Sequence, residues 1–333
     1  MRAVGTVGLG HSALTATALA AVCGVGLETS HVSAQSYPER AIRVVIPFGA
    51  GSAVDVIPRI VLDQMSRDLG QPVIVENRGG AGGTIGMTAV AKSDADGYTL
   101  LVNSSAHTIV PSVYTNLTFD VTKDLAAVAT LGNLPQVMIT ATSKGFKTAA
   151  ELVAAAKAKP GSFNFSTAGV GTATHLAAEK FRLSAGFEAS HVPFKSGAEA
   201  LTEIIAGRVE YYFCPIGTAL PVITDGRIVG LAVSPPKRVA ALPNVPTTLE
   251  LGYAASDYMF WVGLFAPAKT PRPVIDRLNA SVVKAMQDGS VKDRLAKNGV
   301  EPLSMTPAEL DKFVADEIPV NAKLVKALGL KPG

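Results

Sequence analysis

Short apolar runs alternate with amphipathic stretches along most of this 333-residue chain. The first run, residues 42–46, contains four β-branched apolar side chains, which predicts a strand buried on both faces. Small residues then interrupt the pattern, and apolar side chains recur at helical spacing from Ile57 to Leu69. Pro58 stands early in this stretch, where a helix tolerates proline. The pattern therefore predicts a strand, a glycine loop and a helix.

The same arrangement occurs a second time downstream. Residues 163–166 predict a strand, residues 167–172 a glycine loop, and the apolar positions from Leu176 to Phe181 a helix. The amides at the start of a helix have no helical acceptor, so they attract an anion. Two such loops facing each other would hold a small carboxylate.

Further strand and helix patterns alternate through the rest of the chain. Strands are expected at residues 73–75, 99–102, 136–140, 191–194, 209–213, 228–233 and 259–266, the first of these as a buried strand. Helices are expected at residues 84–92, after the capping residues Thr148 and Ser196, and at residues 273–287 and 290–298. A last helix should begin after Thr306, and Pro319 should kink or divide it.

This alternation predicts an α/β fold with mainly parallel sheets and helices on both faces. Ligands bind beyond the carboxyl ends of such strands, where residues 48–52 and 104–107 lie. Two rounds of alternation indicate two lobes, residues 37–135 plus 251–333 and residues 136–250. A cleft between lobes is a preferred place for a small-molecule site.

Residues 1–34 have the pattern of a secretory signal peptide. Arg2 precedes an uncharged apolar segment at residues 13–27, and cleavage is expected after Ala34, so the mature protein is expected in the periplasm. Two alternatives stay open. The chain could be a cytoplasmic protein with an apolar N-terminus, or Cys23 could carry a lipid, which the branched Val22 before it disfavours.

The composition is that of an ordinary globular protein. Hydrophobic residues make up 48% of the chain and charged residues 17%, which excludes a disordered protein. The net charge of +3 is small and scattered, and the chain has no basic run interleaved with aromatic residues, so we expect no nucleic-acid partner. Without Cys23, Cys214 has no partner for a disulfide.

The motifs of common enzymes are missing from the sequence. No Gly-x-Ser-x-Gly elbow is present, and no phosphate-binding loop of the nucleotide hydrolases. The dinucleotide fingerprint fails in both glycine loops, where Val54 and Thr174 replace its third glycine. No cluster has metal-ligand spacing. We therefore expect neither a cofactor nor a metal.

Each candidate residue also has a purely structural interpretation. The glycines could serve only to allow tight turns. Ser52, Asp55 and Thr172 could be helix caps and nothing more. His175 could be a packed or exposed histidine, and Cys214 a buried core residue.

A series of motifs, in order along the chain, is similar to one known family. They are residues 37–38, 42–48 and Asp55, then 75–83, 96–101, 171–176, 192–195, 242–247 and 263–271. Through them, the chain resembles the Bug (TctC-type) family of periplasmic solute-binding proteins, which serve tripartite tricarboxylate transporters. The resemblance covers Tyr37–Gly333.

The resemblance implies a two-lobe, type II periplasmic-binding-protein fold that closes on a small carboxylated solute without a cofactor. It implies that loop amides, hydroxyls and bound waters hold the carboxylate. The implied contacts are Phe48, Gly51, Ser52, Asp55, Ser104, Ser105 and His107 in the first lobe, and Thr167, Gly169, Thr172, Cys214 and Pro215 in the second.

The chain departs from the family pattern at two places. Ala50 and Ser52 replace a proline and a glycine in the first loop, which could reshape the pocket. Cys214 stands where an acidic or amide side chain is common. Our hypothesis is that Cys214 makes the distal pocket less polar and favours a ligand without an amino group.

Three functions follow from these observations. The favoured one is a monomeric receptor that captures a mono- or dicarboxylic acid and delivers it to a tripartite tricarboxylate-type transporter. A binding protein that feeds a signalling partner is the first alternative. The second is a periplasmic hydrolase that uses Ser52 or Ser105 together with His107.

Overall fold

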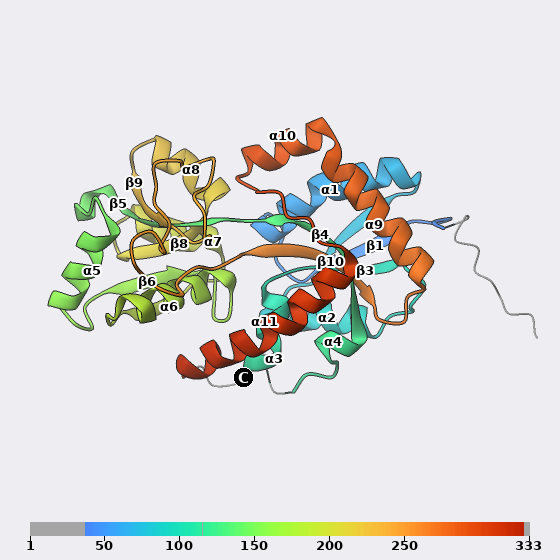
Figure 1. Ribbon diagram of the computed structural model, residues 1–333, viewed down its shortest axis with the longest axis horizontal. Helices are drawn as coiled ribbons and strands as arrows, with labels where there is room; N and C mark the ends of the chain where they lie inside the picture. The colour runs from blue at the N-terminus through green and yellow to red at the C-terminus, as the bar shows by residue number, and fades with distance from the viewer. Residues whose placement is uncertain (1–36, 115, 330–333) are drawn as a thin grey trace, which may run out of the picture. The chain divides into compact units, whose positions relative to one another are not determined.

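The computed structural model describes residues 37–114 and 116–329. The expected signal peptide, residues 1–34, lies outside the described residues, as do its cleavage site and Cys23. The described strands form two five-stranded sheets (Figure 1). In spatial order the first sheet contains β2 (Val73–Asn77), β1 (Ile42–Ile46), β3 (Thr99–Ser104), β10 (Trp261–Pro267) and β4 (Leu125–Asn133). The second contains β7 (Ser190–Pro193), β6 (Asn164–Thr167), β8 (Tyr211–Pro215), β5 (Gln136–Ala141) and β9 (Ile228–Val233).

Helices connect these strands and cover both faces of each sheet. Those associated with the first sheet are α1 (Ala53–Leu69), α2 (Thr84–Ala91), α3 (Ala106–Val113), α4 (Val121–Asp124), α9 (Arg272–Gln287), α10 (Gly289–Lys297) and α11 (Pro307–Ala327). Those associated with the second are α5 (Ala149–Ala158), α6 (Ala173–Ala185), α7 (Gly197–Ile205) and α8 (Ile216–Thr224). Two short 3₁₀ turns, η1 (Ala81–Gly83) and η2 (Thr142–Lys144), complete the elements. The predicted α/β class is confirmed.

The core follows from the alternation of side chains along the strands. Val44 of β1 packs with α1 and α9 on one face, and Val45 packs with α2 and α11 on the other. In β8, Tyr211 and Tyr212 likewise enter two different hydrophobic clusters. Both strands are thus buried on two faces, as a strand covered by helices requires.

Each sheet is mixed, whereas the sequence predicted mainly parallel sheets. β10 runs antiparallel to both β3 and β4, and β5 runs antiparallel to both β8 and β9. These two strands belong to the segments that cross between the sheets, and the amide of Leu134 in one crossing donates to the carbonyl of Phe260 in the other (2.7 Å). The direction of β5 and β10 is therefore set by the crossing and not by a β–α unit.

One further expectation is wrong, and one of the two outcomes expected at Pro319 does not occur. The strand at residues 73–75 was expected to be buried, but β2 is at the edge of its sheet and Ile74 is 56% exposed. An apolar run does not reveal whether a strand has one neighbour or two. The sequence predicted that Pro319 kinks or divides the last helix, and division does not occur, because α11 continues through Pro319 to Ala327. Its capping box, formed by Thr306 and Glu309, is present as predicted.

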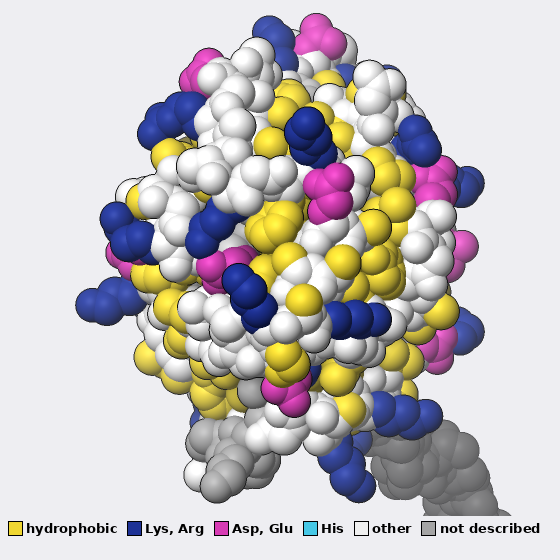
Figure 2. All heavy atoms as spheres, turned by 90° about the vertical axis from the view of Figure 1, so that its left-hand side faces the viewer, with side chains coloured by type: hydrophobic (Ala, Val, Ile, Leu, Met, Phe, Trp, Pro, Cys, Tyr) yellow, Lys and Arg dark blue, Asp and Glu magenta, His cyan; other side chains and the backbone are white. Residues whose placement is uncertain are grey.

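Charged side chains of both signs are interspersed on the face shown in Figure 2. Apolar patches lie between them, and the basic side chains on this face form no continuous band. This agrees with the small net charge of the sequence.

Candidate ligand-binding site

A cavity of about 410 Å³ opens where several strands end and helices begin. Six of the twelve predicted contact residues line it: Phe48, Gly51, Ser52, Ser104, Thr172 and Pro215. Both sheets contribute to the wall. In the first sheet, Phe48, Gly51 and Ser52 follow β1 and Ser104 ends β3, and in the second sheet Thr172 follows β6 and Pro215 ends β8. The cavity lies beyond the carboxyl ends of these strands, as predicted for an α/β sheet.

The loop before α1 is held by a buried carboxylate. The amide of Gly51, whose φ is 79°, donates to Oδ2 of Asp55 (2.8 Å). Oδ1 of Asp55 accepts from Nε of Arg59 (2.9 Å) and from Nδ2 of Asn77 (2.8 Å). Burial opposes ionisation of Asp55, but these hydrogen bonds outweigh it and keep the pKa of the carboxyl below its usual value. Asp55 is therefore a charged support for the loop.

This support leaves the first amides of α1 available. Ala53 and Val54 line the cavity, and their amides have no backbone or side-chain acceptor within the described chain. The buried Oγ of Ser52, at the N-cap, likewise has no hydrogen-bond partner there. The first turn of α1 thus presents unsatisfied donors to the cavity.

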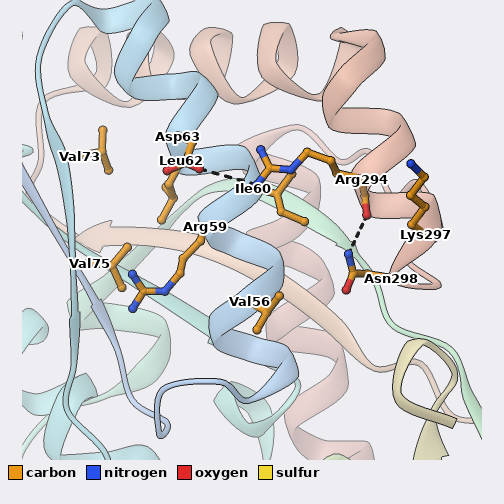
Figure 3. Close-up of a pocket in the computed structure, with 10 residues that line it drawn as sticks. All are labelled: Val56, Arg59, Ile60, Leu62, Asp63, Val73, Val75, Arg294, Lys297 and Asn298. Carbon is orange, nitrogen blue, oxygen red and sulfur yellow. Dashed lines mark hydrogen bonds and ion pairs between the residues drawn. The ribbon is translucent and has the colours of Figure 1, made fainter. Parts of the chain in front are cut away.

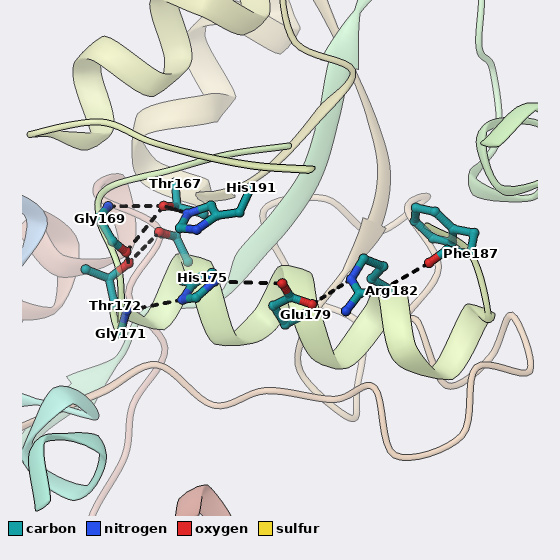
Figure 4. Close-up of polar contacts among 10 residues, drawn as sticks. Thr167, Gly169, Gly171, Thr172, His175, Glu179, Arg182, Phe187 and His191 are labelled. Atoms are coloured by element: carbon teal, nitrogen blue, oxygen red, sulfur yellow. Dashed lines mark hydrogen bonds and ion pairs between the residues drawn. The ribbon is translucent and has the colours of Figure 1, made fainter. Parts of the chain in front are cut away.

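The loop before α6 repeats this geometry with a histidine (Figure 4). The amide of Gly171, whose φ is 74°, donates to Nδ1 of His175 (3.2 Å). Oγ1 of Thr172 donates to the carbonyl of Gly169 (2.8 Å). Burial, with the neighbouring His191 and Arg182, lowers the pKa of His175 to about 3. His175 is therefore neutral near pH 7, and its Nδ1 can accept the hydrogen bond from the loop.

The first amides of α6 are available in the same way. Ala173 and Thr174 line the cavity, and no acceptor for their amides occurs in residues 37–114 or 116–329. Thr174 Oγ1 accepts from the amide of Ala168 (3.0 Å), which fixes the loop against the helix. The loops before α1 and α6 therefore open matching pairs of amides onto one cavity.

Three more helices begin at the same cavity. Their lining residues are Ala106 of α3, Gly197 and Ala198 of α7, and Thr218 of α8. Each helix N-terminus carries a partial positive charge, and the exposed Lys195 in the wall adds a full one. None of the residues that line the cavity is acidic. The electrostatics of the wall thus favour an anion.

The residues that the sequence analysis did not single out for the site come mainly from the second half of the wall. They are Ala53 and Val54 in the first half, and Ala173, Thr174, Lys195, Ser196, Gly197, Ala198, Tyr212 and Thr218 in the second, together with Phe260. The N-cap pattern at Ser196 could have predicted this part of the wall. It marks the start of a helix after a strand, where the first amides have no helical acceptor.

The other six predicted residues lie behind the wall of the cavity. Asp55 and Gly169 support the two loops, as described above. Oγ1 of Thr167 lies 3.3 Å from the carbonyl of Gly169 and 2.6 Å from Nε2 of His191. The polar atoms of Asp55, Thr167 and Gly169 bond to other atoms of the two loops. These three residues therefore shape the loops and do not line the cavity.

Ser105 and His107 are both buried below the start of α3. Oγ of Ser105 accepts from the hydroxyl of Tyr258 (3.2 Å), and the ring of His107 stacks on Phe265 with centroids 4.1 Å apart. Burial lowers the pKa of His107 to about 3. In the part of the chain that the structure describes, no hydrogen bond joins His107 to Ser52 or Ser105.

Cys214 is fully buried in the hydrophobic cluster that also contains Tyr212 and Ile216. Its side chain is not part of the cavity wall, although its neighbour Pro215 is. Burial raises the pKa of the thiol well above its usual value. An effect of Cys214 on the ligand, as hypothesised from the sequence, would therefore have to be transmitted through residues that pack on it.

A second hollow, on the outer side of α1, contains several basic side chains (Figure 3). Arg59 lines it while its guanidinium bonds to Asp55 and to Oδ1 of Asn77 (2.9 Å). Arg294 pairs with Asp63 at 3.8 Å. Because Arg59 and Arg294 are paired with carboxylates and the acidic Asp63 also lines this hollow, we assign the ligand site to the cavity between the helix N-termini.

Neither a metal site nor a membrane span is found in the described residues. No group of three or more histidine, cysteine, aspartate or glutamate side chains there could hold a metal ion. None of the helices described is both long and apolar enough to cross a bilayer.

Comparison of this chain with known proteins identifies its family. A profile of the tripartite tricarboxylate transporter family receptors, TctC, matches residues 57–330. The chain belongs to the TctC family. The curated protein BugT of Bordetella pertussis is 35% identical to it over 321 residues, which are 95% of this chain and 98% of BugT.

Solved structures of similar proteins have the same fold. Rpa4515 of R. palustris, solved with adipate, is 28% identical and covers 89% of this chain and 100% of its own, with a TM-score of 0.83. MatC from Rhodopseudomonas palustris, with bound malate, is 30% identical and covers 87% of this chain and 100% of its own, with a TM-score of 0.79. The TctC family member described here therefore has the two-lobe fold of the solute-binding proteins, which are not enzymes.

Proposed function

We propose that this TctC family member is a periplasmic receptor that captures a small carboxylate and delivers it to a membrane transporter of the tripartite tricarboxylate type. The observation that carries the proposal is the pair of loops whose free amides, at Ala53 and Val54 and at Ala173 and Thr174, line one cavity. Adipate and malate in the structures of similar proteins support a carboxylate as the ligand.

The binding energy can come from these donors without an arginine clamp. Hydrogen bonds to a charged group contribute roughly 1.5–3 kcal/mol each. Three or four of them approach the roughly 8 kcal/mol of micromolar affinity, before the cost of closure is subtracted. Ser52, with its buried and unpartnered hydroxyl, can add a further donor from the N-cap of α1.

Capture would involve closure of two lobes, residues 37–135 plus 251–333 and residues 136–250. The anion first binds the amides of one lobe, and hinge bending at the two crossings then brings the amides of the other lobe to it. A single copy supplies both lobes, so we expect the receptor to act as a monomer after removal of residues 1–34. The closed form would present a changed surface to the transporter.

The hydrolase alternative gains no support from the geometry. His107 is buried against Phe265, and Ser105 accepts a hydrogen bond from Tyr258 and not from a histidine. A general base must lie within hydrogen-bond reach of the hydroxyl that it activates. We therefore propose binding without chemistry.

The test is a thermal-shift screen of the mature protein against small mono- and dicarboxylic acids. A ligand at about 100 times its dissociation constant stabilises by about 2.7 kcal/mol, which is readily seen as a rise in melting temperature. Isothermal titration of the hits gives the dissociation constants. The proposal is wrong if no acid shifts the melting temperature, or if the protein hydrolyses esters and loses this activity in His107→Ala.

A further inference from the structure

The backbone at the start of α8 lies directly against the backbone at the end of α10. Gly217 is the second residue of α8, and a Cβ atom there would lie 2.1 Å from the carbonyl oxygen of Asn298 and 2.6 Å from its carbonyl carbon. A Cβ atom at Gly299 would lie 2.8 Å from the amide nitrogen of Gly217. A side chain at either glycine would therefore overlap with backbone atoms, and only glycine permits this approach. We call this the α8–α10 contact.

The α8–α10 contact joins the two halves of the molecule. α8 packs on β5, β8 and β9 of the second sheet, whereas α10 packs on α1 and α9, which belong with the first. The side chain of Asn298 turns away from α8, because its Nδ2 donates to the carbonyl of Arg294 (2.8 Å; Figure 3). The backbone carbonyl of Asn298 is the part that faces Gly217.

Both sides of this contact are anchored to the same crossing between the sheets. Asn133, at the end of β4, exchanges two backbone hydrogen bonds with Glu301 (3.0 and 2.9 Å), which fixes the segment after α10. The amide of Ile216 donates to the carbonyl of Pro135 (2.9 Å), which fixes the start of α8 just before β5. Only Leu134 lies between these two anchor points. A bend of the crossing therefore changes the distance between α8 and α10.

The contact also adjoins the ligand cavity. A hollow of about 110 Å³ lies between the starts of α1 and α8 and the end of α10. It shares Gly51, Ala53, Pro215 and Thr218 with the ligand cavity, whereas Gly217 lines only the hollow. A movement of the lobes that narrows the cavity therefore also presses α8 against α10.

We infer that Gly217 is a positioning residue for ligand capture, because the α8–α10 contact limits how closely the two lobes approach each other. The inference rests on the proposed function, in which amides of α1 and amides of α6 must reach one anion. An amide that moves about 1 Å away from its acceptor no longer forms a hydrogen bond. A side chain at position 217 would hold the lobes apart without touching the ligand.

The test compares Gly217→Ala with Gly289→Ala by small-angle X-ray scattering and by isothermal titration with adipate and malate. Gly289 is the matched control, because it also stands at the start of a helix and a Cβ there meets no atom within 4 Å. Neither glycine has a left-handed φ, so alanine strains neither backbone. Gly217→Ala should increase the radius of gyration and weaken binding of the acid by about tenfold or more. Gly289→Ala should change neither.

A second pair of variants approaches the contact from α10. Gly299→Ala and Gly186→Ala both place alanine after a helix in a left-handed conformation, with φ of 68° and 65°, so the backbone strain is matched. A Cβ at Gly186 meets no atom within 4 Å. Only Gly299→Ala should therefore increase the radius of gyration and weaken binding. Circular dichroism and the melting temperature of each unliganded variant show that it has folded.

The outcomes separate the inference from the proposed function. If Gly217→Ala and Gly299→Ala match their controls in radius of gyration and affinity, the α8–α10 contact does not limit the approach of the lobes, while carboxylate capture stands. Weaker binding with an unchanged radius of gyration would place the effect in the cavity wall and also overturn the inference. If the wild-type protein binds no acid, the proposed function fails, and scattering of the unliganded proteins alone decides the inference.

Discussion

Asp55 and His175 occupy the same place in two loops, where each accepts a hydrogen bond from the amide of the glycine four residues earlier. The distances are 2.8 Å for Gly51 to Asp55 and 3.2 Å for Gly171 to His175. The acceptor is a charged carboxylate in one loop and a neutral imidazole in the other, because Arg59 and Asn77 favour the charged form of Asp55 and burial favours the neutral form of His175. Both turn the loop so that the next amides face the cavity.

Asp55→Ala should destabilise the protein by about 2–3 kcal/mol, because it leaves the amide of Gly51 and the donors of Arg59 and Asn77 without their acceptor. Urea unfolding at pH 7 measures the change. Asp63→Ala, on the same helix, is the matched control, since its side chain is 59% exposed and its pairing with Arg294 is loose at 3.8 Å. It should cost less than about 1 kcal/mol.

The contribution of Asp55 to stability should also depend on pH. The pKa of Asp55 is lower in the folded protein than in the unfolded chain, so its contribution to stability is present above about pH 4. It is lost as the pH falls through the lowered pKa. The difference in unfolding free energy between wild type and Asp55→Ala should therefore shrink below pH 4, and a constant difference down to pH 2 would contradict this.

Gly51→Ala should lower both stability and ligand affinity. A Cβ at Gly51 meets no atom within 4 Å, so the cost comes from the left-handed backbone, with φ at 79°, and should be about 1 kcal/mol. Gly70→Ala is the control, because Gly70 has a φ of 70° and an equally open position at the other end of α1. Both variants should lose similar stability, but only Gly51→Ala should weaken carboxylate binding in titration, because only Gly51 orients amides at the cavity.

His107→Gln should reduce the pH dependence of stability between pH 7 and pH 5, although the buried His175 keeps its own share. The pKa of buried His107 is lowered to about 3, so the unfolded chain takes up a proton near pH 6.5 that the folded protein does not bind. Stability therefore falls as the pH falls through this window, by about 2 kcal/mol from this residue. Between pH 7 and pH 5, the unfolding free energy of the variant should therefore fall by about 2 kcal/mol less than that of the wild type. Urea unfolding at both pH values measures this. An equal fall in the two proteins would contradict the burial of a neutral imidazole.

The thiol of Cys214 should not react with a disulfide reagent in the folded protein. It is fully buried, and burial raises its pKa well above the usual value, so almost no thiolate is present or accessible. Labelling should follow the rate of unfolding and should slow when a carboxylate ligand is bound. Rapid labelling of the native protein would show that Cys214 reaches the surface of the cavity.

The strands, helices and caps that depend on one short segment can be predicted from the sequence. β1, α1, β6 and α6 were predicted near their observed ends, because short apolar runs, glycines and helical spacing act over a few residues. The cap at Thr306 was predicted for the same reason. β4 was missed, since its alanine-rich sequence has little preference for a strand and its pairing with β10 comes from far along the chain.

Of residues close together in one segment, only some line the cavity, and the sequence does not specify which. Trp261 is fully buried, whereas the residue before it, Phe260, lines the cavity. Cys214 and Tyr212 belong to the same hydrophobic cluster, yet only the tyrosine reaches the cavity. The side chains of Phe260 and Trp261 differ because adjacent positions point in opposite directions, whereas Tyr212 and Cys214 are two positions apart on one face of β8 and differ in their distance along the strand from the cavity.

By itself, the sequence determined two strand–loop–helix units with free amides at their ends, because these depend on the spacing of apolar and small residues within one segment. Only the tertiary structure decided that both units line one cavity, and that Tyr212, Lys195 and the start of α7 line it too. The physical reason is that cavity walls are made by strand register and by contacts between segments distant in sequence, which no local pattern specifies.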